Sequence, residues 1–286
     1  MSSTLQVRVD DRLRAAGALL AAGAWPEREQ AAKAYKPHRV AESAHKFFAP
    51  QREHPAVLGA LSLAGQGEGL GRLYGHALNG DWAEDIAVEA FIGAARPEDF
   101  WAETQADWQE AENDARAVMA RADLAQFLDD LLGPQARQLV LVPNLLFPGR
   151  QSVAASSAAE VVVCAPPPQA WGTSPPWRYS ERPDEVLAKV SEAFAHSLFE
   201  AGLPPAHAAL RPRAEAFALA AAVLFLRQAE GEAAGDQFMV MEKKTRGLKS
   251  LPALVAALEP VLAGRRAGKF NTFEDYLPEL SGVLVT

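Results

Sequence analysis

The chain has 286 residues, of which 49 % are hydrophobic and 22 % are charged, so it can bury a substantial core and is not disordered throughout. Its 28 basic and 36 acidic residues give a net charge of −8, which argues against general binding to nucleic acids or anionic membranes. The single cysteine, Cys164, excludes an internal disulfide framework and cysteine-cluster zinc or iron–sulfur sites.

Residues 1–133 are predicted to form a helical N-terminal region. Its first helix, 12–22, has an apolar core like that of a signal peptide, but acidic residues precede it, so we interpret it as part of a soluble, cytoplasmic protein. The longest apolar run is also shorter than the roughly 20 residues that span a bilayer. Proline and glycine positions and apolar spacing predict the remaining helices of this region: 31–48 divided near Pro37, Pro55 to about 64, 82–95, and 97–132 with a break at 121–123.

Residues 134–286 are predicted to mix strands and helices. Two β-branched apolar runs, 137–147 and 158–167, indicate strands, and a proline-rich segment (166–177) is typical of a surface loop, with a peptide-binding role as the weaker alternative. Helical patterns then cover 184–201, 213–228, 252–262 and a short stretch from about 272. Together these elements indicate a predominantly helical α+β fold with a small sheet, in which both regions form one compact unit.

Two neighbouring helices carry the residues with the most chemistry. Glu192 and His196 are four positions apart on the polar side of the first helix, the spacing at which one helix presents two groups to a metal. The second helix, 213–228, is apolar around its whole circumference, so it is expected to be buried on every side. Glu215 lies at its beginning, where a carboxylate should need a cation, a metal or hydrogen-bond donors.

The segment "EAFAHS" (192–197) resembles the "HEFAHS" motif of gluzincin zinc metallopeptidases, whose third ligand is a glutamate on the next helix. More specifically, the chain is similar to a family of uncharacterised bacterial proteins with this motif, over about residues 8–284. Further matching pieces are "FFAPQREHPAV" (47–57), "VPNLLFPG" (142–149) and "GKFNTFEDYLPEL" (268–280). The resemblance implies a zincin-like region over 134–286 and a degenerate metal-ligand set of Glu192, His196 and Glu215.

The motif departs from the family at two positions that matter for mechanism. Glu192 replaces the first histidine ligand, and Ala193 replaces the glutamate that takes a proton from metal-bound water and returns it to the leaving amine. Loss of such a general acid–base commonly costs about 10²- to 10⁴-fold in rate. We therefore expect a pseudoenzyme without peptidase activity, with no catalytic residues and no required cofactor. Its expected role is binding or regulatory, with a peptide or protein partner in the ancestral cleft between the sheet edge and helix 184–201.

Two alternatives remain open. In the first, Glu192, His196 and Glu215 hold a divalent metal, zinc or manganese, and the chain is a divergent metal-dependent hydrolase. In the second, the chain is a plain structural or interaction protein: Glu192 and His196 form a local pair, and Glu215 is a first-turn acid favoured by the helix dipole.

Other candidate residues are interpreted more simply. Cys164 follows three valines in a predicted strand and is expected to be a buried structural thiol. His207, between the two key helices, is expected to be a loop histidine, with a substitute metal ligand as the alternative. The basic cluster "EKKTRGLK" (242–249) is interpreted as an exposed helix end, because it lacks the aromatic partners typical of nucleic-acid binding.

Overall fold

The computed structural model describes residues 4–82, 86–169 and 178–284, and of 281–284 it describes the backbone alone. Most of the predicted proline-rich loop therefore lies outside the described residues. The chain divides into two compact units. The N-terminal unit comprises Val7–Ala117 and Val140–Arg182, and the C-terminal unit comprises Met1–Gln6, Val118–Leu139 and Pro183–Thr286. This division is interleaved along the sequence, whereas the sequence suggested a single boundary at 133/134 within one compact unit.

Several helices of the N-terminal unit begin at prolines or end before glycines. Helix α1 packs against α3, α4 and α5, and most of its side chains are buried. The predicted start at Pro55 is confirmed, as are the interruption near Pro37 and the break at 121–123. The run from Pro97 contains a further break at Thr104, whose hydroxyl donates to the carbonyl of Phe100. The eight helices described in this part of the chain are α1 (Asp11–Ala22), α2 (Trp25–Ala32), α3 (Arg39–Phe48), α4 (Pro55–Ala64), α5 (Gly69–Asn79), α6 (Val88–Ala95), α7 (Pro97–Glu103) and α8 (Gln105–Met119).

Four strands form a mixed sheet in the order β1-β2-β4-β3: β1 (Leu5–Val7), β2 (Gln138–Pro143), β3 (Val153–Ser156) and β4 (Glu160–Ala165). The two predicted strands are confirmed as β2 and β4, whose apolar side chains are almost all buried. Strand β3 pairs antiparallel with β4, with Val153 opposite Cys164. The sequence did not predict β1 or β3, because β1 is only three residues long and β3 consists mostly of alanine and serine, which are weak strand formers.

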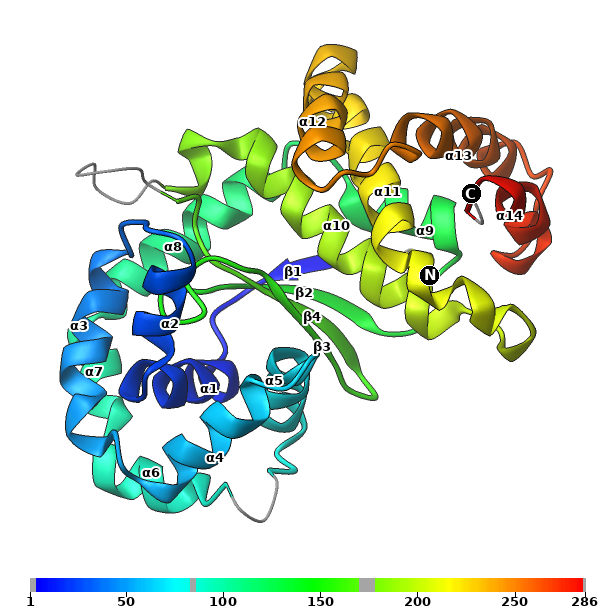
Figure 1. The fold of residues 1–286 in the computed structure, drawn as a ribbon. Helices are drawn as coiled ribbons and strands as arrows, with labels where there is room; N and C mark the ends of the chain where they lie inside the picture. The colour runs from blue at the N-terminus through cyan, green and yellow to red at the C-terminus, as the bar shows by residue number, and fades with distance from the viewer. Residues whose placement is uncertain (1–3, 83–85, 170–177, 285–286) are drawn as a thin grey trace. The chain divides into compact units, whose positions relative to one another are not determined.

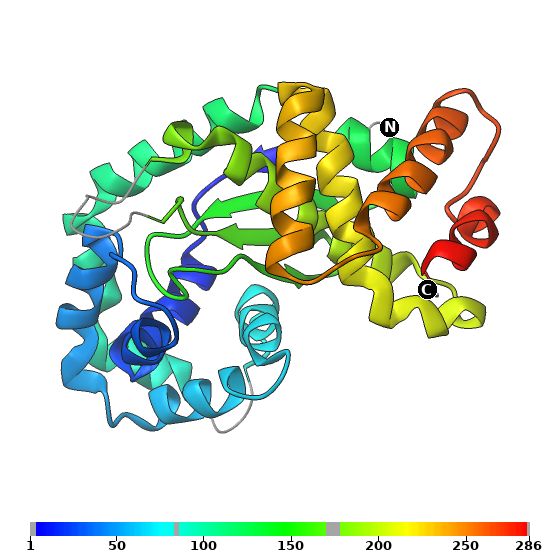
Figure 2. The same cartoon turned by 45° about the horizontal axis from the view of Figure 1, so that its top comes forward.

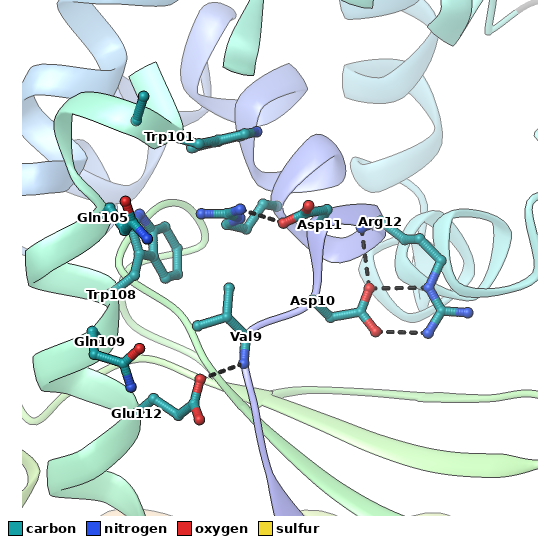
Figure 3. A pocket seen from close by; sticks show the side chains of 11 residues that line it. Val9, Asp10, Asp11, Arg12, Trp101, Gln105, Trp108, Gln109 and Glu112 are labelled. Atoms are coloured by element: carbon teal, nitrogen blue, oxygen red, sulfur yellow. Dashed lines mark hydrogen bonds and ion pairs between the residues drawn. The ribbon is translucent and has the colours of Figure 1, made fainter. Parts of the chain in front are cut away.

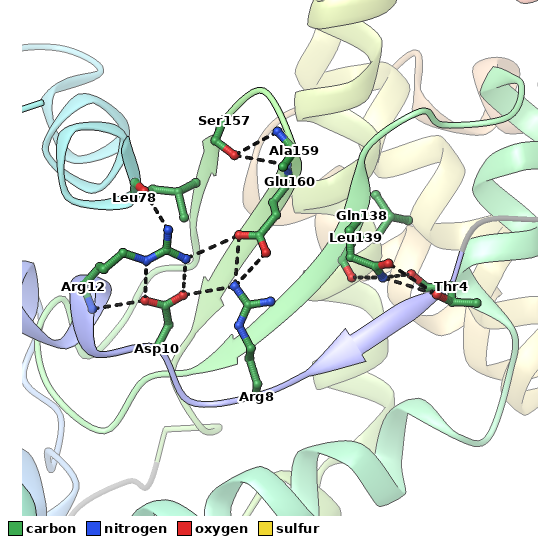
Figure 4. A network of polar contacts seen from close by, with 10 residues as sticks. All are labelled: Thr4, Arg8, Asp10, Arg12, Leu78, Gln138, Leu139, Ser157, Ala159 and Glu160. Carbon is green, nitrogen blue, oxygen red and sulfur yellow. Dashed lines mark hydrogen bonds and ion pairs between the residues drawn. The ribbon is translucent and has the colours of Figure 1, made fainter. Parts of the chain in front are cut away.

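A polar cluster joins the end of β1 to the start of α1. The side chain of Asp10 caps α1 by accepting a hydrogen bond from the amide of Arg12 at 3.1 Å. Its carboxylate also pairs with the guanidinium of Arg12 at 2.6 Å and with that of Arg8 at 3.1 Å (Figure 4). Arg8 in turn contacts both oxygens of Glu160 at 2.9 Å. Two arginines and two carboxylates thereby neutralise one another at this corner of the fold.

The C-terminal unit is helical, and α11 lies at its centre. Helix α11 packs against α10, α12 and α13 (Figures 1 and 2). Its side chains from Phe217 to Leu226 are all buried, which confirms the prediction from its all-round apolar surface. The six helices described in this part of the chain are α9 (Leu124–Leu132), α10 (Pro183–Gly202), α11 (Ala214–Glu230), α12 (Glu232–Thr245), α13 (Leu251–Arg266) and α14 (Leu277–Leu284).

The predominantly helical α+β class with a small sheet is confirmed. Among the described helices, none is both long and apolar enough to cross a membrane. The sequence predicted neither helix α5, whose glycine-rich start was interpreted as a loop, nor helix α12. The second of these bears on the candidate site. It determines the surroundings of the candidate site, because Arg246 follows directly after it as its C-cap residue.

Candidate functional site

The structure brings Glu192 and Glu215 together on one guanidinium group. Arg246 Nη1 lies 2.7 Å from Glu192 Oε1 and 3.0 Å from Glu215 Oε1, and Nη2 lies 3.1 Å from Glu192 Oε2. Both oxygens of Glu192 therefore accept from the fork of Arg246, a geometry for which arginine is particularly suited. The two carboxylates that the sequence predicted as metal ligands share an internal cation.

A third carboxylate completes the cluster. Glu242, one helical turn before Arg246, accepts a hydrogen bond from its Nε at 2.7 Å. The three acids come from three successive helices of the same unit, with Glu192 on α10, Glu215 at the start of α11 and Glu242 near the end of α12. We call Glu192, Glu215, Glu242 and Arg246 the arginine cluster. One positive charge faces three negative charges in it, so the cluster is a net anion.

Burial is uneven across the arginine cluster. The side chain of Glu192 is 18 % exposed and that of Arg246 is 33 % exposed, whereas that of Glu215 is 56 % exposed. Burial raises the pKa of Glu192 above its ordinary value, and the hydrogen bond and charge of Arg246 offset this only in part. The ionised form of Glu192 thus depends on Arg246 as its counter-ion.

For Arg246, the neighbouring carboxylates have a larger effect on the pKa than burial has. Burial alone would lower its pKa, but hydrogen bonds to Glu192 and Glu215 and the nearby charge of Glu242 outweigh burial and raise the pKa. The guanidinium stays charged at every physiological pH. Arg246 therefore acts as a permanent counter-ion for the three carboxylates.

His196 lies outside this cluster. Its Nδ1 is 3.5 Å from Glu200 Oε2, one turn further along α10, and its side chain is 42 % exposed. The local pair considered from the sequence, Glu192 with His196, is not among the interactions of the described residues. Instead, Glu192 faces Arg246 and His196 faces Glu200.

These contacts do not fit a metal site. A metal needs free donor atoms converging at about 2 Å, but Glu192 and Glu215 are engaged by a cation and His196 is engaged by a different acid. Within the part of the chain that the structure describes, no group of three His, Cys, Asp or Glu side chains is arranged to hold a metal ion. The contacts of these residues therefore support no metal-dependent step at this site.

Two residues beside the predicted set also bear on the chemistry. Ala193 follows Glu192 in α10 and is partly exposed, and its methyl side chain has no group that can move a proton. His207 lies in a 3-10 segment, Pro205–Arg213, and belongs to no metal-ligand group among the described residues. Position 193 of α10 therefore lacks the general acid–base that the motif requires there.

Cys164 is buried in β4, which confirms the prediction of a buried thiol. Burial raises the pKa of the Cys164 thiol, and the negative charge of Asp10 raises it further. The thiolate that would act as a nucleophile is therefore disfavoured. Cys164 is a packing residue of the sheet.

Sequence reasoning missed Arg246, although the signal for it was present. The sequence indicates that Glu215 needs a cation and that 242–249 is a basic helix end. It does not indicate their pairing, because Arg246 and Glu192 are 54 positions apart and nothing local specifies the contact. Glu215 is also more exposed than its place at the start of a buried helix suggested.

In the comparisons with known proteins, no protein-family model, no curated protein and no solved structure matches this chain.

Proposed function

We propose that the chain is a catalytically degenerate, metallopeptidase-like protein with a binding or regulatory role. The proposal rests chiefly on the salt bridges from Arg246 to Glu192 and Glu215, which place an organic cation between the two carboxylates that the motif comparison assigns to the metal. Ala193 supports it independently, because it stands where the motif needs its proton-transferring glutamate. Under this proposal the fold of the motif helices is a zincin-like remnant.

The arginine cluster replaces the structural part of a metal's role. A metal holds together side chains from neighbouring helices, and Arg246 does the same for α10, α11 and α12 by donating hydrogen bonds to three carboxylates. It cannot replace the chemical part, because a guanidinium does not lower the pKa of a bound water to near neutrality as zinc does. The retained surface is then available for binding a peptide or protein partner without cleaving it.

An activity measurement tests the proposal. The purified full-length chain should release no fragments from a mixed pool of unstructured peptides, whether zinc or a chelator is added. The control is the His196→Ala variant, which should give the same background. Chelator-sensitive cleavage that is lost in the His196→Ala variant would refute the proposal and favour the divergent metal-dependent hydrolase.

A restored motif tests the zincin-like ancestry separately. Glu192→His and Ala193→Glu together recreate the histidine–glutamate pair, and Arg246→Met frees Glu215. This triple variant should bind about one zinc ion per chain, because the two histidines of the restored motif, four positions apart, and Glu215 supply three ligands once His196 turns away from Glu200. The matched control keeps Arg246 and should bind zinc much more weakly. A folded triple variant that binds no zinc would contradict the zincin-like assignment while leaving the absence of peptidase activity as a separate question.

A further inference from the structure

The N-terminal unit contains a cavity of about 630 Å³ that the proposed function does not use. Its volume lies within the range of roughly 300–1,000 Å³ that is usual for small-molecule sites. The start of α1 forms one wall, and side chains of α7 and α8 form the other, with Gln105, Trp108, Gln109 and Glu112 following one another along α8 (Figure 3). Indole rings, carboxamides and charged groups thus surround one space.

Arg14 is the distinctive group of this cavity. Its guanidinium carbon lies 4.5 Å from the ring centre of Trp101 and 5.1 Å from that of Trp108, so two indoles hold the guanidinium plane in place. The side chain is only 12 % exposed. Its Nε is buried and has no hydrogen-bond partner among the described residues. A buried donor without a partner is costly, which points to a missing acceptor.

Among the described residues, the one acid that pairs with Arg14 is weakly held. Asp11 contacts Nη2, but the Asp11 side chain is 77 % exposed, and ion pairs in such positions contribute little to stability. The other acids of the cavity wall are already engaged. Asp10 pairs with Arg8 and Arg12, and Glu112 accepts from the amide of Val9 at 3.2 Å and pairs with Arg116. Of the two arginines in this wall, Arg12 already pairs with Asp10 and Glu160, so Arg14 is the one with donor capacity left for a ligand.

We infer that this cavity binds a small organic carboxylate, whose charged group pairs with Arg14 in exchange for Asp11. A single guanidinium offers a fork that matches a carboxylate in charge and geometry, whereas a doubly charged phosphate would need further free cations. The body of the ligand lies along Trp101 and Ala102. The carboxamides of Gln105 and Gln109 face the same space and can bind its polar substituents.

The test compares two probes of the same shape, benzoate and its neutral counterpart benzamide. Binding is followed by NMR of the indole N–H resonances in the full-length chain, with Trp101→Phe and Trp108→Phe used for assignment. We expect saturable shifts of these two resonances with benzoate and binding at least about 10-fold weaker with benzamide, because a charge-assisted hydrogen bond is lost. Equal or tighter binding of benzamide would overturn the inference, as would the absence of saturable benzoate binding up to about 10 mM.

Two variants assign the effect to Arg14 and Asp11. Arg14→Gln should remove the preference for benzoate. Arg39→Gln is the matched control: Arg39 is 74 % exposed and does not line this cavity, so the variant should keep the preference. Asp11→Asn should tighten benzoate binding about 3- to 10-fold, since it removes the competing carboxylate. This last result stays informative if Arg14→Gln fails to fold, and unchanged or weaker binding by Asp11→Asn contradicts the exchange.

Discussion

Arg246 donates hydrogen bonds to three carboxylates at once. Its loss leaves the largely buried carboxylates of Glu192 and Glu242 without this counter-ion. We expect Arg246→Met to lower the free energy of unfolding by about 1–3 kcal/mol, less than for a fully buried pair because a third of the Arg246 side chain is exposed.

Chemical denaturation measures this loss. The matched control is Arg121→Met in the same unit, which breaks the more exposed pair of Arg121 with Glu230 and should cost at most about 0.5 kcal/mol. Equal effects of the two substitutions would mean that the arginine cluster has no special role in stability.

The raised pKa of Glu192 predicts a specific pH dependence. A carboxyl whose folded-state pKa lies above its unfolded value stabilises the fold in its protonated form, and this stabilisation is lost as the pH rises through the folded pKa. Glu192→Gln cannot titrate. Its free energy of unfolding minus that of the wild type should therefore increase between about pH 4 and about pH 7. A difference that stays constant or decreases over this window would show that Glu192 is not the titrating group.

For Asp10 we expect the opposite dependence of stability on pH, because its pKa is lowered. Asp10 therefore serves as the reference for Glu192. Burial alone would raise its pKa, but hydrogen bonds from Arg12 and Arg8 outweigh burial and lower it. Its contribution to stability is therefore present above the ordinary aspartate pKa and is lost as the pH falls through the folded pKa.

Asp10→Asn isolates this charge, because asparagine is an equally good helix cap. Its free energy of unfolding relative to the wild type should decrease as the pH rises from about 2 to about 5. Denaturant titrations at several pH values measure the slope, and a rising difference would contradict the pKa direction of Asp10.

At the scale of elements, the position of α12 depends on its close approach to α11. A Cβ atom on Gly235 of α12 would lie 2.4 Å from Arg227 Cγ and 2.8 Å from the carbonyl oxygen of Val223, both on α11. Gly235→Ala must therefore push α12 away from α11. This shift also moves Arg246, which lies at the end of α12. Overpacking of this kind typically costs about 1–3 kcal/mol.

Gly75 provides the control for this prediction. It also lies within a helix, α5, but a Cβ there would meet no atom within 4 Å. Gly75→Ala should be neutral or stabilise by up to about 1 kcal/mol through its better helix propensity. Thermal melts compare the two variants, and a Gly235→Ala protein as stable as Gly75→Ala would show that helix packing at Gly235 is not tight.

The elements divide into those that local sequence specifies and those that it does not. Helix starts at Pro55 and Pro183, the all-round burial of α11 and the two valine-rich strands were predictable, because propensity and periodicity act over a few residues. Strand β3 exists because β4 supplies its partner, and its own residues do not favour a strand. Helix α12 has charged residues on much of its surface and little apolar periodicity, so only its packing on α11 reveals it.

At the candidate site, too, local sequence predicts some contacts and cannot predict others. The sequence placed Glu192 and Glu215 on neighbouring helices, and the structure brings both to Arg246. It also predicted that His196 would join them, but the orientation of a side chain on a half-exposed helix depends on which acid is nearer, here Glu200. A motif comparison matches residue types at positions within the motif. It could not predict that Arg246, at the end of a helix distant in sequence, would contact these carboxylates.

At the scale of the whole molecule, the two proposed sites lie in different units of the chain. The C-terminal unit contains an arginine cluster that binds its own acids together, and the N-terminal unit contains a cavity with an incompletely satisfied arginine. Because no residue named in one site belongs to the other unit, variants of the arginine cluster should leave benzoate binding unchanged. Measuring benzoate affinity of the Glu192→Gln variant checks this independence, and a large change in affinity would show that the units are coupled.

The most direct measurement of the central claim is the melting temperature of the untagged full-length chain in zinc and in chelator, combined with its metal content. If Arg246 is the permanent cation of this site, the wild type should contain far less than one metal ion per chain and should melt at the same temperature in both conditions. Arg246→Met should melt lower than the wild type in chelator. A wild-type chain that carries about one zinc ion and loses stability when the zinc is removed would contradict the account.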